Sequence, residues 1–453
     1  MIERLLFSRR GGPRRLPFAG HALALRHDPL RVWRDLARRH GGVAPLHLGP
    51  LRGYLVTDPE HVGDVLLRKA DHYTRRTRVY KAMAAFLGQS ILTTEGEGWR
   101  VHRRIVQPAF HRRRLASFAG AIVELTRADL GAWSGEIDVS ERMMRLTLQI
   151  VSEVLLGTET EGHAEDIGHA IDEAQRYTEH VMSQVVEISR HVPTPRNRTF
   201  LRSVATLDRV AYDIIDRRQR GGERGDDAVS MLLDARYEDG TELSRERIRN
   251  ELLTLLAAGH ETTSNALSWT LMRLSQHPDV ARRLVAEVDR VIGDRPPTFE
   301  DVAKLTFTRW VFDETMRLHP PVWTTGRQAI KDHTLGDTDI PAGTTIVLSP
   351  YVTHRRADLW ENPEGFDPDR WGTLSQRGAL PPYTFYPFGG GRRKCVGEAF
   401  AYLEAMLILA CLAQAKRLEL SDRAVVPSLQ VTMGFESGLW MRASDRVRTR
   451  AAE

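Results

Sequence analysis

The hydrophobic pattern divides the chain into a short first part of mixed elements and a long helical remainder. Residues 1–70 combine turn-forming Pro and Gly with brief apolar runs such as Gly53–Val56, followed by a helix-like stretch over Pro59–Lys69. From about residue 98 to residue 290 the apolar spacing is helical, with breaks at 131–138, 191–198 and 221–227. The pattern predicts a small β-rich lobe over about 1–70 and a helical body over about 71–453.

One predicted helix is apolar around almost its whole circumference, which is typical of a helix through the middle of a large protein. It can begin at Ser244, a good N-cap with Glu246 in the first turn, and it ends at His277 because Pro278 follows. Its centre nevertheless reads Gly-His-Glu-Thr-Thr-Ser-Asn over 259–265. Burying an unpartnered polar group costs about 2–7 kcal/mol, so this polar segment is a candidate site.

The composition excludes several classes of protein. The chain has 453 residues and a formal net charge of +5, and arginine far outnumbers lysine. The pI of about 9.3 could suggest nucleic-acid binding, but no binding module is visible and we expect none. The longest apolar run, Ala405–Ala413, is shorter than the roughly 18 residues of a membrane span. Pro and Gly interrupt the basic N-terminal segment, so we expect no transit peptide and a cytoplasmic protein.

The segment 388–397 places a cysteine in an unusual setting, since it reads Phe-Gly-Gly-Gly-Arg-Arg-Lys-Cys-Val-Gly. Glycines allow positive φ angles that bring amide groups close to the sulfur. The helix that follows and the neighbouring Arg392, Arg393 and Lys394 would stabilise a thiolate, so Cys395 is a nucleophile or a metal ligand. The alternative is a glycine-rich anion-binding turn that contains a cysteine by chance. The second cysteine, Cys411, lies in an apolar stretch and is expected to be inert.

Phe388, Gly391, Arg393, Cys395 and Gly397 together form a five-position motif that resembles the haem-binding loop of the cytochrome P450 family. The resemblance implies that Cys395 is the axial ligand of the haem iron and that Phe388 shields its sulfur. It also implies that Arg393 pairs with a haem propionate and that Gly397 lets the next helix pass close to the porphyrin.

The resemblance extends over essentially the whole chain and implies the fold and the cofactor. The expected fold is mainly α, a helical triangular prism with a small β-rich lobe, in one domain over 1–453. Haem b would lie between the central helix and the helix that follows Cys395. No flavin or iron–sulfur motif is visible, so we expect no fused reductase.

Other segments match the family in the expected order. Trp99 and Arg103 lie four residues apart on one helical face and match its propionate clamp, and Arg327 matches a third propionate position. Ordinary helix packing is the alternative for Trp99.

Glu314 and Arg317 lie three residues apart on one predicted helix. The resemblance implies that they pair with Arg370 to brace the cysteine loop, which is a structural role. The segment 353–358 only approximates a further family stretch, which leaves the role of His354 open.

The polar segment of the central helix resembles the family's oxygen-activation motif. Gly259 and a threonine bonded to a carbonyl one turn earlier would open a groove in the helix. The resemblance implies that Thr262 donates to bound oxygen and that Glu261 supplies protons by moving between solvent and groove. The alternative is a helix kink without chemical use.

The resemblance implies a monooxygenase that oxidises an apolar molecule such as a fatty acid, terpenoid, steroid or macrolide-like compound. Family position suggests apolar or small substrate contacts in four segments. They are Val79, Ala82, Phe86, Leu87, Leu255, Ala258, Val322, Trp323, Thr324 and Phe435.

Electrons are expected from a separate ferredoxin or flavodoxin with its NAD(P)H reductase, on a monomeric enzyme. The Arg-rich segments 100–104, 111–114 and 392–394 would form its docking face, unless they are simply a solvated basic surface. A haem-thiolate peroxygenase, an isomerase or dehydratase, or a haem carrier or sensor are the alternatives. The presence of Glu261 and Thr262 favours the monooxygenase.

Overall fold

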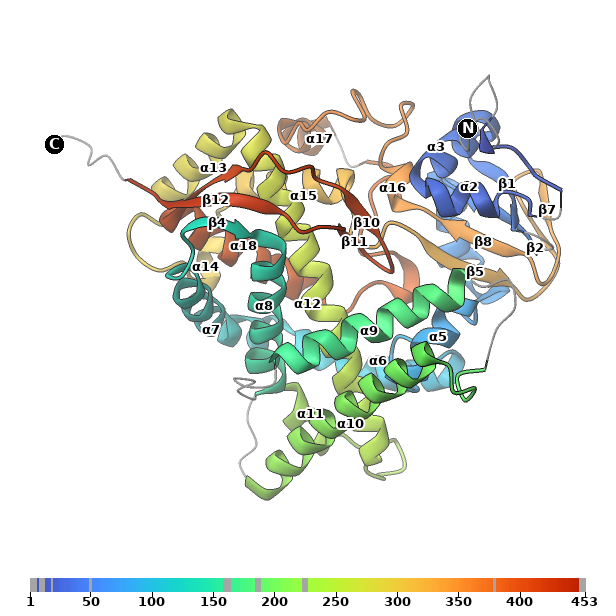
Figure 1. Cartoon of the computed structure of the whole chain (residues 1–453), viewed down its shortest axis with the longest axis horizontal. Coiled ribbons are helices and arrows are strands. Elements are labelled where there is room, and N and C mark those ends of the chain that lie inside the picture. The colour runs from blue at the N-terminus through green and yellow to red at the C-terminus, as the bar shows by residue number, and fades with distance from the viewer. Residues whose placement is uncertain are drawn as a thin grey trace.

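The computed structural model is built around one long helix, α12 (Arg245–Gln276), which crosses the middle of the molecule (Figure 1). The structure describes residues 6–7, 13–17, 19–48, 51–157, 164–183, 189–221, 227–377 and 380–447. The Ser244 side chain caps α12 by accepting a hydrogen bond of 3.2 Å from the Arg247 N–H. The helix ends before Pro278, so both predicted ends are confirmed.

Most of the remaining chain forms helices that cover α12. The helices that pack on it most extensively are α8 (Val139–Ile150), α10 (Pro195–Gly221), α15 (Thr306–Leu318) and α18 (Glu398–Ala415). The other long helices are α5 (Arg78–Leu87), which packs on α9 and α12, α7 (Arg112–Leu130), which packs on α18 and α8, α9 (Ala164–Ser183), which packs on α10 and α5, and α13 (Pro278–Val291), which packs on α18, α15 and α12. The shorter α-helices are α2 (Ala22–His27), α3 (Pro29–His40), α4 (Pro59–Gly63), α6 (Gly96–Val106), α11 (Ala228–Asp234), α14 (Phe299–Val302), α16 (Pro350–Thr353) and α17 (Asp369–Arg377).

A five-stranded sheet lies at the N-terminal end of the molecule, on the right in Figure 1. Its order is β1 (Val43–Leu48), β2 (Leu51–Val56), β8 (Thr345–Leu348), β5 (Thr325–Ala329) and β3 (Tyr73–Thr74). β2 and β8 run parallel, with Leu55 opposite Val347, and the other pairs are antiparallel. The sheet therefore extends beyond the lobe predicted over 1–70, because two of its strands come from 325–348.

Local differences from the predicted elements are small. The predicted helix over Pro59–Lys69 is α4 followed by a π-helical segment, Asp64–Arg68. α10 begins at Pro195, inside the predicted break at 191–198, because proline suits the first turn of a helix. Of the predicted break at 221–227, residues 222–226 lie outside the described residues.

Two smaller sheets close the C-terminal half. β12 (Trp440–Asp445) pairs with β4 (Gly135–Asp138) on one side and with β9 (Lys416–Leu420) on the other. β10 (Pro427–Leu429) and β11 (Met433–Phe435) form a hairpin, which we call the C-terminal hairpin. β6 (His333–Leu335) and β7 (Thr338–Ile340) form a further pair.

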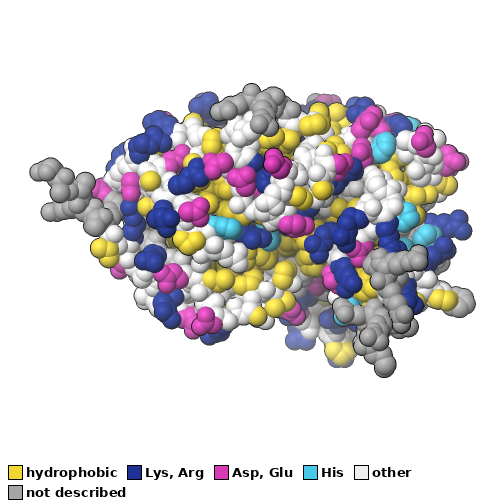
Figure 2. All heavy atoms as spheres, turned by 90° about the horizontal axis from the view of Figure 1, so that it is seen from above, with side chains coloured by type: hydrophobic (Ala, Val, Ile, Leu, Met, Phe, Trp, Pro, Cys, Tyr) yellow, Lys and Arg dark blue, Asp and Glu magenta, His cyan; other side chains and the backbone are white. Residues whose placement is uncertain are grey.

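α18 is the most apolar helix of the core. By length and composition it could cross a membrane, but 72% of it is buried inside the protein. Cys411 lies within it and is 1% exposed, as expected for an inert core residue. On the face seen in Figure 2, Lys and Arg side chains are interspersed with Asp and Glu, so the net charge of +5 does not form a continuous basic surface there.

Candidate functional site

One face of α12 is uncovered at the centre of the molecule. Between Ile248 and Met272 every residue is buried except Ala258, Gly259 and Thr262. These three lie one above another on the same side of the helix. The Thr262 hydroxyl donates to the Ala258 carbonyl at 2.7 Å, which is the predicted bond to the preceding turn. The core therefore has open space beside this hydroxyl.

The cysteine loop is shaped by its glycines. The Cys395 N–H donates to the Phe388 carbonyl at 3.0 Å and closes the loop. Gly389 and Gly391 have φ angles of 71° and 62°. A Cβ on Gly391 would lie 1.9 Å from the Leu66 carbonyl oxygen, so no other residue fits there.

The Cys395 side chain is exposed, although protein surrounds it closely enough that burial raises the pKa of its thiol. Both observations fit a sulfur that faces an internal space. The Gly397 N–H, Arg103 and Lys394 oppose the rise, whereas Arg393 points elsewhere, contrary to the sequence expectation. A bound metal cation would favour the thiolate further.

The neighbours of the sulfur leave room on one side. The Phe388 ring lies against Tyr402 with centroids 5.2 Å apart, next to the loop. A Cβ on Gly397 would meet only Phe110, at 3.6 Å, and the Cys395 sulfur, at 3.9 Å, within 4 Å. Gly397 therefore lies beside the thiol, and the Phe388 ring packs on Tyr402 at the start of the same loop.

Three arginines, Arg75, Arg327 and Arg393, form a cluster that we call the arginine cradle. The Arg393 guanidinium lies over the Trp99 ring, 4.3 Å from its centroid, and donates to the Thr94 carbonyl at 2.8 Å. Burial and the nearby Arg75 charge lower the pKa of Arg393 to about 9. The same two causes lower the pKa of Arg327 to about 10. The cradle thus holds more buried positive charge than it neutralises.

Tyr80 reports the same excess of positive charge. Burial alone would raise the pKa of its hydroxyl, but Arg75 and Arg327 lower it to about 8. The carboxylate of Glu95 approaches from one side, where it accepts from the Arg75 N–H. The Arg75 Nε is buried and has no hydrogen-bond partner among the described residues. Anionic groups such as the two carboxylates of a porphyrin fit this cradle.

Sequence reasoning missed Arg75 and Tyr80. The basic run at 75–78 directly after β3 was the available signal. The sequence also predicts that Trp99 and Arg103 act together at a propionate. In the structure these two side chains have different partners. Arg103 donates to the Lys394 carbonyl of the cysteine loop at 2.8 Å.

The predicted brace, Glu314, Arg317 and Arg370, is a complete buried network. Arg317 donates to both oxygens of Glu314, at 2.8 and 2.9 Å, and neither side chain is exposed. Arg370 donates to the same carboxylate at 3.0 Å. Arg317 also donates to the His354 carbonyl, and the His354 ring accepts from the Tyr386 N–H at 3.0 Å. His354 therefore connects the brace to the start of the cysteine loop.

Glu261 is turned away from the Thr262 face. Its carboxylate accepts hydrogen bonds from Gln175 of α9 and from Thr432 beside the C-terminal hairpin, the latter at 2.5 Å. Burial raises the pKa of Glu261. Gln175 and Thr432 were missed because they are 86 and 171 residues away in sequence.

The proposed substrate contacts fall into different environments. Ala82, Phe86, Leu87, Leu255 and Trp323 are at most 8% exposed and belong to the packed core. Phe435 stacks on Trp269 at 4.2 Å. Ala258 and Val322 are exposed, and Val79 and Thr324 are half-buried. Of the ten, Ala258 lies directly on the uncovered face of α12.

The side chains at this site suit a metal ion that a cofactor already coordinates and that takes one ligand from the protein. Within the part of the chain that the structure describes, no three His, Cys, Asp or Glu side chains form a metal-binding group. One thiol, an uncovered helix face and an arginine cradle fit an iron porphyrin, with Cys395 as the protein's ligand and Arg75, Arg327 and Arg393 at the propionates.

Comparisons with known proteins agree with this geometry. The family model described as Cytochrome P450 matches residues 11–438. Cyclooctatin synthase of Streptomyces melanosporofaciens is 35% identical over 412 residues, covering 90% of this chain and 89% of its own. Cyclooctat-9-en-7-ol 5-monooxygenase of the same organism is 34% identical over 420 residues, covering 90% and 88%. Pentalenene oxygenase of Streptomyces avermitilis is 30% identical over 444 residues, covering 96% and 97%. The chain belongs to the cytochrome P450 family, and it is a haem-dependent oxidoreductase of the monooxygenase type.

Proposed function

We propose that this cytochrome P450 hydroxylates or epoxidises a polycyclic terpenoid, using electrons from a separate redox partner. Three relatives carry names that refer to pentalenene, cyclooctatin or cyclooctat-9-en-7-ol. The observation that carries the proposal is the Thr262 hydroxyl on the uncovered face of α12, with a buried carboxyl next to it in sequence. Apolar side chains surround this face, which suits a hydrocarbon substrate.

When bound, the haem supplies the activation of dioxygen and the insertion of one oxygen atom, with two electrons and two protons consumed. Cys395 would hold the iron, and the arginine cradle would bind the propionates. Thr262 would donate a hydrogen bond into the open space, and Glu261 would supply its proton. Ala258 and the apolar core around it would exclude water and orient the substrate.

The cofactor we propose is haem b. Covalent attachment of a c-type haem uses two cysteines in a Cys-x-x-Cys-His motif. The chain has two cysteines, 16 positions apart at Cys395 and Cys411, so this attachment is impossible.

The redox partner we propose is an acidic ferredoxin or flavodoxin that acts with an NAD(P)H reductase in the cytoplasm, on a monomeric enzyme. Arg112, Arg113 and Arg392 are exposed close to elements that hold the cysteine loop. α7, which begins at Arg112, packs along α18, the helix after Cys395. Charge complementarity at such a surface accelerates docking.

A spectral titration tests the substrate class first. The ferric protein is titrated with polycyclic terpenes, fatty acids and steroids while the Soret band is followed. A blue shift with terpenes alone supports the proposal. A shift with another class contradicts the terpenoid substrate, and a reduced carbon monoxide spectrum without thiolate character contradicts Cys395 as ligand.

Thr262→Ala tests the chemistry. Product formed per NAD(P)H is expected to fall about tenfold or more, because the proton donor is lost. The matched control is Thr270→Ala, since Thr270 makes the same bond to Ala266 at 2.7 Å but is fully buried. Unchanged, tightly coupled NAD(P)H-dependent turnover in Thr262→Ala would contradict the proposed role of Thr262 in a monooxygenase reaction.

A further inference from the structure

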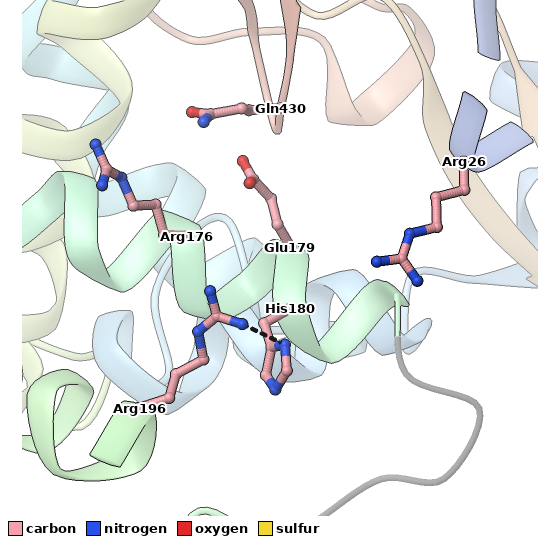
Figure 3. Close-up of a pocket in the computed structure, with 6 residues that line it drawn as sticks. All are labelled: Arg26, Arg176, Glu179, His180, Arg196 and Gln430. Atoms are coloured by element: carbon pink, nitrogen blue, oxygen red, sulfur yellow. Dashed lines mark hydrogen bonds between the residues drawn. The ribbon is translucent and has the colours of Figure 1, made fainter. Parts of the chain in front are cut away.

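A pocket of about 490 Å³ lies outside the haem site, between α2, α9, the first turn of α10 and the C-terminal hairpin. Six residues from these elements line it (Figure 3): Arg26, Arg176, Glu179, His180, Arg196 and Gln430. Glu179 points from α9 toward Gln430 across the pocket (Figure 3). None of the proposed substrate contacts lines this pocket.

Glu179 is the acid in this pocket. One of its carboxylate oxygens is buried without a hydrogen-bond partner among the described residues. Burial and the charges of Asp172 and Glu261 raise the pKa of Glu179 to about 7, and Arg176 and Arg196 oppose them. Its charge therefore changes near neutral pH.

The other polar groups of the pocket keep their charge at neutral pH. Arg196 donates to the His180 Nδ1 at 2.6 Å. Burial and Arg196 lower the pKa of His180, so it stays neutral. The Arg26 and Arg176 guanidinium groups attract negative charge toward the pocket.

We call the contact between α9 and the C-terminal hairpin the seam. The pocket lies on one side of the seam and Glu261 lies on the other. On α9, Gln175 donates to Glu261 and Glu179 follows four residues later on the same face of the helix. Near the hairpin, Thr432 donates to Glu261, and Gln430, two residues earlier, lines the pocket. The charge of Glu261 is one of the causes that raise the pKa of Glu179 across this seam.

This arrangement gives Glu261 a source of protons. The Glu261 carboxylate faces the seam and not the Thr262 hydroxyl. It is therefore placed to receive a new proton from the pocket side. We propose that Glu179 is the proton-transfer residue that takes protons from water in this pocket and passes them to Glu261. The proton goes from a hydronium ion in the pocket, which leaves as water, to the Glu179 carboxylate and then to the Glu261 carboxylate, which restores the charged Glu179 without any redox change. The inference rests on the proposed monooxygenase function.

The test compares Glu179→Gln with Glu173→Gln. Glu173 lies on the same helix, is exposed on its side chain by 38% and is outside the pocket. In Glu179→Gln the rate of product formation is expected to fall about tenfold. Its solvent isotope effect is expected to rise, because proton delivery becomes limiting. Glu173→Gln is expected to match the parent protein in both measurements.

A second readout needs no turnover. Infrared spectra of the ferric protein are recorded between pH 5 and pH 9, and the C=O band of protonated carboxyls is followed. A band that titrates with a midpoint of about pH 7 is expected in the parent protein and in Glu173→Gln, and it is expected to be missing in Glu179→Gln.

Two results would overturn the inference. One is a Glu179→Gln variant with the parent rate and the parent isotope effect. The other is a titrating band that survives in Glu179→Gln. Failure of the proposed function looks different, because the parent protein itself would then show no NAD(P)H-dependent product with any terpene, while the infrared band still tests Glu179.

Discussion

Buried and half-buried arginines gather in two places in the molecule, and their partners differ. In the brace, Arg317 is fully buried and donates to both oxygens of Glu314 and to three backbone carbonyls. In the arginine cradle, the side chains of Arg327 and Arg393 donate to main-chain carbonyls or a hydroxyl, and the Arg75 Nε has no partner among the described residues. Glu95 is the carboxylate that acts on both Arg327 and Arg393.

This difference separates a structural charge from a binding charge. A buried cation is stable when a carboxylate and hydrogen-bond acceptors surround it. The brace meets that condition within the chain, so its charges need no ligand to balance them. The cradle does not, since burial and the charge of Arg75 lower the pKa of Arg327 to about 10 and that of Arg393 to about 9. Anionic groups of a ligand would balance the positive charge of the cradle.

The largest effect is expected in the brace. Glu314→Gln keeps the shape of the side chain but removes the charge that faces Arg317 and Arg370. Because a buried cation is then left without its anion, the free energy of unfolding should fall by about 3–5 kcal/mol. Urea denaturation of the haem-bound protein measures it.

The control is an exposed pair. Asp369→Asn breaks the contact of Asp369 with Arg283, whose side chains are 54% and 49% exposed. This change should cost about 1 kcal/mol or less. Equal losses in the two variants would contradict a structural role for the brace.

A smaller effect is expected in the cradle, and it should appear in haem binding instead of folding. Arg75→Gln removes one cation, so the haem-free protein should lose no stability because repulsion with Arg327 and Arg393 decreases. The haem dissociation constant should rise about tenfold or more, since a hydrogen bond to a charged group contributes about 1.5–3 kcal/mol. Haem transfer to a haem-free globin measures this change.

Arg76→Gln provides the comparison for that experiment. Arg76 follows Arg75 directly, its side chain is 76% exposed and it contacts Glu95 at 3.5 Å from outside. Haem transfer in Arg76→Gln should match the parent protein. If the two variants lost haem equally fast, the cradle would not be a specific site for the propionates.

The sequence was informative where chemistry is local. The capped ends of α12, the cysteine loop and the bond from Thr262 to Ala258 depend on neighbouring residues, and the structure contains each of them. The cradle and the partners of Glu261 come from segments that only the fold brings together. Gln175 carries no local signal that distinguishes it from surface residues, and the basic run at 75–78 does not show which of its arginines faces inward.

The sheet shows the same limit. Its first strands were visible near Gly53–Val56, but β5 and β8 come from 325–348 and join by long-range pairing. The short strands there have no periodic pattern long enough to reveal the partner strand. Long-range pairing therefore had to come from the structure.

A third effect is expected on the ionisation of Tyr80, whose hydroxyl responds to the charges of the arginine cradle. Its pKa in the haem-free protein should be about 8, because Arg75 and Arg327 favour the tyrosinate. Since this pKa is lowered from its ordinary value of 10.0, ionisation adds stability as pH rises from about 8 to 10, and that stability is lost as pH falls through 8.

Ultraviolet difference spectra of tyrosinate measure this titration. The midpoint should move up when haem carboxylates enter the cradle, and it should move up in haem-free Arg75→Gln as well. Tyr80→Phe identifies the band by removing it. A midpoint that stays near 8 after haem binding would place the propionates away from the cradle.

The smallest effect is expected for arginines that lie in water. Reversing Arg112 and Arg113 to Glu should slow electron transfer from a ferredoxin several-fold at low salt, through weaker steering. Stopped-flow reduction of the haem measures the rate, and Arg417→Glu, at a side chain that is 74% exposed on β9, is the control. The Debye length falls from about 10 Å at 0.1 M salt to about 3 Å at 1 M, so the difference should vanish at high salt.

A rate and salt dependence equal to those of the parent protein would mean that these residues are only a solvated basic face. Salt should leave the brace and the cradle almost unaffected, because buried charges are poorly screened, and this contrast separates the arginines of the brace and the cradle from Arg112 and Arg113.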